Sequence, residues 1–299
     1  KATFTVKDEN DNVVEIIPQN IGFREFKMDG NIMKINGKRI VFKGVNRHEF
    51  DCYHGRAIPE SKIAHDLEIM KLHNINAVRT SHYPNNSKLY ELCDIYGLYV
   101  IDETNLESHG TWQIRGTVRC DQNTVPNDIP HWHDAVLDRA KSMLERDKNH
   151  ASIIIWSCGN ESYGGKNIFD MSEYFRKADP SRLVHYESIC WDRVNEASGK
   201  MVLAMPDERR YDGTSDMESQ MYTKVAQIKE FLSKYREKPF ICCEYTHSMG
   251  NSNGGMHKYT DLTDEEPLYQ GGFIWDFADQ AIWTRDLYGN DVMNYGGDF

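Results

Sequence analysis

Short apolar runs alternate with amphipathic segments along most of the chain. The runs contain mainly Ile, Val, Leu and Phe, as in residues 153–156, Ile-Ile-Ile-Trp. Runs of this kind, bounded by polar residues, are typical of strands that are buried on both faces. We therefore expect strands at residues 40–44, 75–79, 98–102, 152–156, 182–186, 240–243 and 273–275.

The segments between these runs have the periodicity of helices. Ile63, Leu67 and Met70, for example, are spaced i, i+4 and i+7, so they fall on one face of a helix. The same pattern predicts helices at residues 60–73, 86–96, 134–147, 167–178 and 223–236. Strands joined by single helices imply a parallel sheet, and the seven strands are one short of a closed (β/α)8 TIM barrel, an α/β fold.

The missing eighth strand has room between residues 187 and 222, and we expect it near 217–222. The competing architecture is a doubly wound open sheet. It is disfavoured because no glycine-rich phosphate-binding turn follows any of the strands. The first 45 residues differ from the rest, since turn sequences at residues 8–12 and 36–38 separate short strands and predict β-hairpins.

Charge and composition exclude several classes of partner. The 299 residues include 35 Lys and Arg and 46 Asp and Glu, and the net charge of −11 argues against a nucleic-acid partner. No apolar run approaches the roughly 18 residues of a membrane-spanning helix, so we expect no membrane partner. Seven cysteines without framework spacing predict reduced thiols and a cytoplasmic location. Because the chain begins with Lys1, we expect it to be a piece of a longer protein.

Polar and ionisable residues follow almost every predicted strand. In a TIM barrel the functional groups lie at the carboxyl ends of the strands, so these residues are expected to share one rim. Each of them alone is more simply explained as a solvated loop residue, but their recurrence favours a functional site. The segments concerned are residues 46–49, 79–83, 102–109, 159–161, 244–247 and 275–276.

Two carboxylates at this rim are the candidate catalytic pair. Glu161 follows the apolar strand at 152–156, and Glu244 directly ends the strand at 240–243. A carboxylate at the end of a buried strand is costly unless it is paired or used. Two such residues across a barrel mouth suit hydrolysis of a glycosidic bond, where one must be protonated and the other ionised.

Aromatic and histidine side chains at the rim are candidates for binding a sugar, although single residues of these types are more often structural. Aromatic rings stack on the apolar face of a sugar, and imidazoles hydrogen-bond to its hydroxyls. The candidates are Tyr83, Trp112, Tyr222, Trp275, His48, His82, His109 and His247.

Glu107 and His109 form a possible metal site. In extended chain the side chains of residues i and i+2 point the same way, so these two residues and a third group would share one ion. The mixed oxygen and nitrogen donors suit Mn²⁺ or Zn²⁺ as well as Mg²⁺. A Glu-x-His triplet alone is a weak signal.

Several segments resemble glycoside hydrolase family 2. Residues 76–84 (NAVRTSHYP) resemble one signature of this family, and residues 148–161 resemble the signature that holds its acid/base. Residues 243–251 (CEYTHSMGN) resemble the nucleophile segment of the LacZ-type β-galactosidases within the family, as do residues 271–276 and 295–299. The resemblance extends from about residue 21 to residue 299.

The resemblance implies a role for each matching residue. Glu161 is similar to the general acid/base and Glu244 to the nucleophile of a retaining double displacement on terminal β-D-galactosides. Glu107, His109 and Glu161 resemble the ligands of an active-site Mg²⁺, and Phe299 resembles a residue of a Na⁺ site. The positions that match substrate contacts are His48, His82, Asn160, Tyr222, His247 and Trp275.

The resemblance also implies how the chain is organised. Residues 1–27 resemble the end of a preceding β-sandwich domain, with its last strand at residues 21–24, and residues 28–299 resemble a TIM-barrel catalytic domain that lacks its final stretch. Flanking domains and a homo-oligomeric parent are then expected. Two alternatives stay open: a related β-glucuronidase or β-mannosidase, and a folded but inactive sugar-binding fragment.

Overall fold

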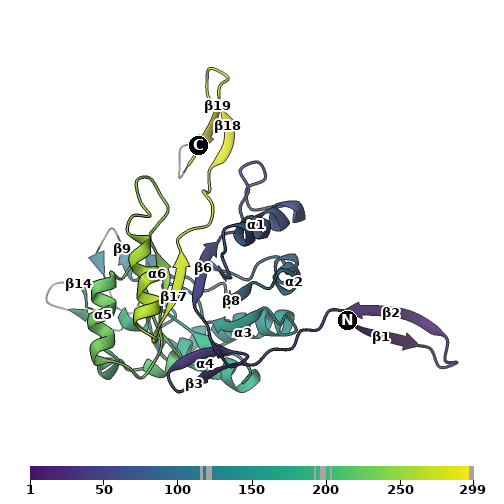
Figure 1. Cartoon of the computed structure of the whole chain (residues 1–299), viewed down its shortest axis with the longest axis horizontal. Helices are drawn as coiled ribbons and strands as arrows, with labels where there is room; N and C mark the ends of the chain where they lie inside the picture. The colour runs from purple at the N-terminus through teal and green to yellow at the C-terminus, as the bar shows by residue number, and fades with distance from the viewer. Residues whose placement is uncertain (115–116, 119–122, 192, 196–199, 203, 296–299) are drawn as a thin grey trace.

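A computed structural model describes all residues except 115–116, 119–122, 192, 196–199, 203 and 296–299 (Figure 1). Its central sheet has eight strands in the order β12-β11-β8-β7-β6-β17-β16-β15, and every ladder between neighbours is parallel. The strands are β6 (Phe42–Arg47), β7 (Ala77–Thr80), β8 (Tyr99–Glu103), β11 (Ile153–Ser157), β12 (Leu183–His185), β15 (Glu218–Met221), β16 (Phe240–Tyr245) and β17 (Tyr269–Ile274). Because β17 pairs with β6, the last and first strands meet, and the predicted TIM barrel is confirmed.

The seam of the barrel lies between β12 and β15, which share no ladder in the described residues. It is held by Asp216, whose backbone N–H donates to Val184 O at 2.9 Å and whose Oδ2 accepts from Val184 N at 2.7 Å. At the next residue of β12, His185 Nε2 lies 2.8 Å from Ser219 Oγ on β15. Strand β15 is the expected eighth strand, and these contacts place it beside β12.

In the described residues six α-helices surround the strands, and the five predicted ones are confirmed to within two residues. They are α1 (Glu60–Leu72), α2 (Ser87–Tyr96), α3 (His133–Asp147), α4 (Lys166–Ala178), α5 (Val225–Lys234) and α6 (Met256–Glu265). Sequence patterning missed α6 because Leu262 is its one buried residue, which leaves almost no apolar stripe to detect. None of the described helices is long and apolar enough to span a bilayer.

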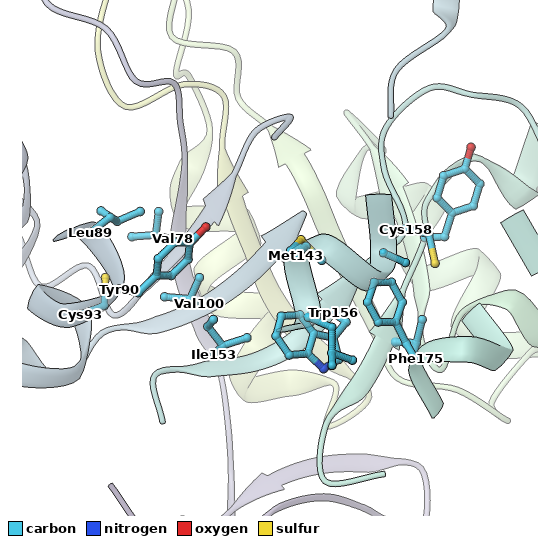
Figure 2. Close-up of a cluster of buried hydrophobic side chains, with 14 of the residues drawn as sticks. Val78, Leu89, Tyr90, Cys93, Val100, Met143, Ile153, Trp156, Cys158 and Phe175 are labelled. Carbon is cyan, nitrogen blue, oxygen red and sulfur yellow. The ribbon is translucent and has the colours of Figure 1, made fainter. Parts of the chain in front are cut away.

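Two layers of core fix the barrel. Outside the sheet, Val78, Val100 and Ile153 pack against the surrounding helices, and Trp156 stacks on Phe175 of α4 with 5.8 Å between ring centroids (Figure 2). Inside the sheet, bulky strand residues fill the barrel, so its interior is packed rather than open. These interior residues are Phe42, Ile101, Ile155, Ile241 and Phe273.

A small antiparallel sheet closes the end of the barrel opposite the functional rim. It contains β3 (Phe26–Asp29), β4 (Ile32–Ile35) and β5 (Lys38–Arg39). Met33 is fully buried, and its backbone N–H and C=O are both bonded by the side chain of Gln270 on β17, at 2.7 and 2.9 Å. This sheet confirms the hairpin pattern predicted for the first part of the chain.

The N-terminal hairpin, β1 (Ala2–Lys7) with β2 (Val13–Gln19), projects away from the barrel (Figure 1). The strand expected at residues 21–24 is wrong, since the structure has no strand there. No described strand lies beside this segment to pair with it. Instead Arg24 anchors it by donating to Ala151 O and Ile153 O at 3.1 and 3.0 Å.

Three further hairpins complete the described chain. Two of them lie in long loops that follow barrel strands, β9 (Gln113–Ile114) with β10 (Thr117–Val118) and β13 (Arg193–Asn195) with β14 (Lys200–Val202). The third, β18 (Ile282–Arg285) with β19 (Asp291–Asn294), extends beyond the barrel near the C-terminus (Figure 1).

Candidate active site

A fully buried arginine organises the rim. Arg79, at the carboxyl end of β7, donates through Nε and Nη2 to the two carboxylate oxygens of Glu103, at 2.8 and 3.1 Å. Its Nη1 donates to Glu244 Oε1 at 3.1 Å and to Asn46 Oδ1 at 2.9 Å, and its Nη2 to Asn160 Oδ1 at 2.8 Å. One guanidinium on β7 therefore binds groups at the ends of four other strands.

Glu244 is held in a fixed orientation by these surroundings. The side chain is nearly buried at the end of β16. Besides Arg79 at Oε1, its Oε2 accepts a hydrogen bond of 2.7 Å from the Tyr222 hydroxyl. Burial and the Glu244 charge raise the pKa of Tyr222, so this hydroxyl keeps its proton and remains a donor. The arrangement leaves a carboxyl group whose two oxygens each accept a hydrogen bond and whose orientation is fixed.

Glu161 has a different environment. It follows β11 in a left-handed backbone conformation with φ of 37°, and its Oε2 contacts His109 Nδ1. Burial raises the pKa of Glu161; His109 opposes this effect, and the charges of Glu244 and Glu107 raise the pKa further. Two carboxyl groups at one rim thus have different surroundings, and differing surroundings are what divides acid and nucleophile roles between two carboxyl groups.

Glu187 adds a third carboxyl group that was not predicted. It lies two residues beyond the end of β12 and is 1% exposed. Its Oε1 accepts a hydrogen bond of 2.7 Å from the backbone N–H of Glu161. Burial, followed by the Glu161 charge, raises the pKa of Glu187 to about 8.

Aromatic rings form one wall beside Glu244. His82 stacks on Trp275 with 5.2 Å between centroids and an interplanar angle of 6°, and its Nε2 lies 3.7 Å from Glu244 Oε1. His48 meets Trp275 edge-on at 5.3 Å. Burial, together with the nearby His82 and Arg56, lowers the pKa of His48 to about 4, so its ring is neutral near pH 7.

The remaining sequence candidates occupy the same region. His247 is exposed and lies beside Tyr222, with 5.7 Å between ring centroids. Trp112 is buried, stacks on His109 and donates its indole N–H to Glu161 O at 2.8 Å, so it packs beneath the site. The Tyr83 hydroxyl lies at this same rim, 3.1 Å from His48 Nδ1.

The three metal-ligand candidates are neighbours. His109 contacts Glu161 directly, whereas Glu107 Oε1 accepts from Asn160 Nδ2 at 3.0 Å. In the described part of the chain, no group of three or more His, Cys, Asp or Glu side chains surrounds one point as a ligand set would. Phe299, predicted to belong to a Na⁺ site, lies outside the described residues.

Sequence reasoning missed the residues that position the candidates. Arg79, Glu103 and Asn46 stand at predicted strand ends but received no individual role, because their partners come from distant parts of the chain. Glu187 carried a usable signal, since it is an acidic residue directly after the predicted strand at 182–186. The same reasoning that selected Glu161 and Glu244 applies to it.

Comparisons with known proteins agree with this picture. Residues 26–299 match the family model described as "Glycosyl hydrolases family 2, TIM barrel domain". A β-galactosidase of Halalkalibacterium halodurans is 56% identical over 98% of this chain and 27% of its own length. The β-galactosidase large subunit of Lactobacillus helveticus is 48% identical over 98% of this chain and 45% of its own. The chain thus spans between about a quarter and a half of these relatives.

Solved structures add support for the fold alone. A β-glucuronidase from Ruminococcus gnavus in complex with D-glucaro 1,5-lactone aligns with a TM-score of 0.73, covering 96% of this chain and 51% of that one at 20% identity. A β-D-glucuronidase of Dictyoglomus thermophilum aligns with a TM-score of 0.69 at 22% identity, covering 96% and 52%.

Proposed function

This chain belongs to glycosyl hydrolase family 2, and we propose that it is the catalytic barrel of a retaining β-galactosidase that cleaves terminal non-reducing β-D-galactosides. The observation that carries the proposal is the pair Glu161 and Glu244, two rim carboxyl groups in different surroundings. Burial raises the pKa of Glu161, whereas Glu244 accepts hydrogen bonds from Arg79 and Tyr222. The relatives near 50% identity are called β-galactosidases, whereas the β-glucuronidases are similar only at about 20%. The galactoside is therefore favoured over the glucuronide.

In the first chemical step, Glu244 attacks the anomeric carbon of the bound galactoside. Glu161 gives its proton to the glycosidic oxygen, the bond from carbon to that oxygen breaks, and the aglycone leaves as an alcohol. Arg79 and Tyr222 hold the attacking carboxylate in place and limit its rotation. The product of this step is a galactosyl ester of Glu244.

In the second step, Glu161 acts in the reverse sense. Its carboxylate takes a proton from a water molecule, the water oxygen attacks the anomeric carbon, and the ester bond to Glu244 breaks. Two inversions leave galactose with its original β configuration. Both residues return to their starting protonation states.

We propose that the substrate-binding residues comprise a ring that stacks on the sugar and side chains that hydrogen-bond to its hydroxyls. Trp275 offers a ring face for the apolar side of the sugar, and its stacking partner His82 orients it. His48 is neutral and has one ring nitrogen on Tyr83, which leaves the other nitrogen for a sugar hydroxyl. Asn160 and His247, in the segments that follow β11 and β16, supply further hydrogen-bonding groups.

The stereochemistry of the first product tests this function. We expect proton NMR of a nitrophenyl β-galactoside reaction to show β-galactose first, with α-galactose appearing later by mutarotation. A panel of nitrophenyl glycosides should favour the galactoside by at least about tenfold over the glucuronide and mannoside. First release of α-galactose would contradict the retaining assignment, and preference for another sugar would replace the substrate.

We also propose that Glu107, His109 and Glu161 hold a divalent cation, Mg²⁺ in the first instance. The supporting observation is the accumulation of negative charge, because Glu107 and Glu244 both raise the pKa of Glu161. A cation bound there would compensate these charges and fix the orientation of the Glu161 side chain. The proposed Na⁺ site at Phe299 stays a prediction.

Removal of the metal is expected to lower activity. Treatment with EDTA should reduce kcat/KM about tenfold or more, and Mg²⁺ should restore it. Glu107→Gln should raise the Mg²⁺ concentration for half-restoration by about tenfold or more, measured also by calorimetric Mg²⁺ titration. Glu91, an exposed residue of α2, provides the control substitution Glu91→Gln. An unchanged Mg²⁺ affinity in Glu107→Gln would exclude Glu107 as a ligand.

The domains that flank the barrel, its assembly and its cellular compartment are also proposals. We infer a longer chain with flanking domains and a homo-oligomeric assembly, which is consistent with the greater length of the relatives. The five described free cysteines support a reducing compartment such as the cytoplasm.

A further inference from the structure

Glu187 is a buried acid that the double displacement leaves without a role. It stands beyond β12, the strand that pairs in parallel with β11, so its side chain reaches across to the residues that follow β11. Its Oε1 accepts the backbone N–H of Glu161 at 2.7 Å and also the hydroxyl of Ser188. A carboxyl group at this depth is costly unless it is hydrogen-bonded, and these two donors meet that need.

The backbone that carries Glu161 is unusual. Gly159 has φ of 135°, and a Cβ there would lie 2.6 Å from Leu106 O, so this position requires glycine. Two residues later, Glu161 has φ of 37°, which is left-handed and uncommon for a residue with a side chain. Such a conformation persists only where the surroundings impose it.

Side chains from two other segments impose it. The N–H on one side of the Glu161 Cα is bound by Glu187, and the C=O on the other side accepts the Trp112 indole N–H at 2.8 Å. Trp112 is buried and stacked on His109, so it is itself held in place. The direction of the Glu161 side chain therefore depends on these two contacts.

We propose that Glu187 is a positioning residue that, by accepting the Glu161 N–H, aims the Glu161 carboxyl group at the departing oxygen. This inference rests on the proposed function, because it assumes that Glu161 is the acid/base. A displacement of about 1 Å is enough to lose about 10²-fold in a precisely oriented reaction. Loss of the contact should therefore damage proton transfer more than nucleophilic attack.

The dependence on the leaving group separates this role from a general structural one. The dinitrophenolate of a dinitrophenyl galactoside leaves without being protonated. The sugar or methanol that leaves from lactose or a methyl galactoside must receive a proton as the bond breaks. We expect Glu187→Met, which keeps length but cannot accept the N–H, to lose about 10²-fold in kcat/KM on lactose and about threefold or less on the dinitrophenyl substrate. Glu187→Gln keeps an acceptor oxygen and should stay within about threefold of wild type on both.

A second readout uses the water-attack step. In Glu187→Met, turnover of the dinitrophenyl galactoside should be limited by base assistance from Glu161. Azide attacks the galactosyl ester without a base, so it should raise kcat of Glu187→Met and yield galactosyl azide, with little effect on wild type. Glu173→Met on the exposed face of α4 controls for the substitution itself and should resemble wild type in both assays.

The outcomes distinguish the alternatives. Equal losses on lactose and the dinitrophenyl galactoside, without azide rescue, would reduce Glu187 to a structural residue and overturn the proposal. Losses in Glu187→Gln as large as in Glu187→Met would overturn the assignment of Oε1 as an acceptor. If Glu187→Met fails to fold by circular dichroism, Ser188→Ala decides, because it loosens the same oxygen; we expect a selective loss on lactose of about three- to tenfold.

Failure of the proposed function gives a different result. A wild-type protein that cleaves another β-glycoside and no galactoside would overturn the substrate assignment, but the leaving-group comparison for Glu187 then proceeds on that sugar. A protein with wild-type galactosidase activity and an unselective Glu187→Met would overturn the positioning role alone.

Discussion

Glu244→Gln is expected to abolish turnover of a nitrophenyl β-galactoside, with kcat/KM falling by at least about 10⁴-fold, since removal of a nucleophile elsewhere costs up to about 10⁶. An amide oxygen cannot form the galactosyl ester, so the reaction loses its intermediate rather than a stabilising contact. The substitution preserves the size of the side chain, and its one remaining oxygen can still accept from either Arg79 or Tyr222. Substrate binding should therefore survive.

The measurement is a steady-state assay of the full-length protein with dissociation constants for galactose determined by calorimetry. Glu218→Gln is a matched control, because Glu218 is also a buried glutamate paired with an arginine, Arg209. Glu218 begins β15, so it lies at the end of the strand away from the functional rim. We expect this variant to keep its activity per folded molecule. Near-normal turnover in Glu244→Gln would remove Glu244 from the role of nucleophile.

The barrel was predictable because its signals are local. Each strand is a short apolar run, and most helices bury a stripe that repeats with helical spacing, as in α4 with Ile168, Met171 and Phe175. Where the local signal fails, the prediction fails. Helix α6 buries Leu262 alone, and the segment at 21–24 has residues suited to a strand but no described neighbour to pair with.

The candidate site was predictable only in part, because only some of its residues have a signal in the neighbouring sequence. Position after an apolar strand identified Glu161 and Glu244 without knowledge of their partners. Arg79 and Glu244 are 165 residues apart, and only the closed barrel brings them within 3.1 Å. Long-range pairs of this kind give each carboxyl group its surroundings, so spacing along the chain could not divide the roles of the two glutamates, which only the family resemblance implied.

Arg79→Met should cause the largest loss of stability among single substitutions at the rim. It leaves the carboxylates of Glu103 and Glu244 buried without their cation, and breaking a buried ion pair from one side costs about 3–5 kcal/mol. We expect urea unfolding to show a reduction of this size in the free energy of unfolding. The surface pair of Arg236 and Glu266 provides the control, since Arg236→Met should cost less than about 1 kcal/mol.

The pH dependence of the stability lost in Arg79→Met identifies the cause of that loss. Burial alone would raise the pKa of Glu103, but Arg79 and His82 outweigh it and lower the pKa to about 2 in the folded protein, against 4.5 as the ordinary value. Because the folded pKa is depressed, this contribution is complete above about pH 4.5 and is lost as the pH falls toward 2. Wild type should therefore lose more stability than Arg79→Met between pH 6 and pH 3, and the two curves should converge in acid. Parallel curves would mean that the loss arises from packing around Arg79 and not from its charge.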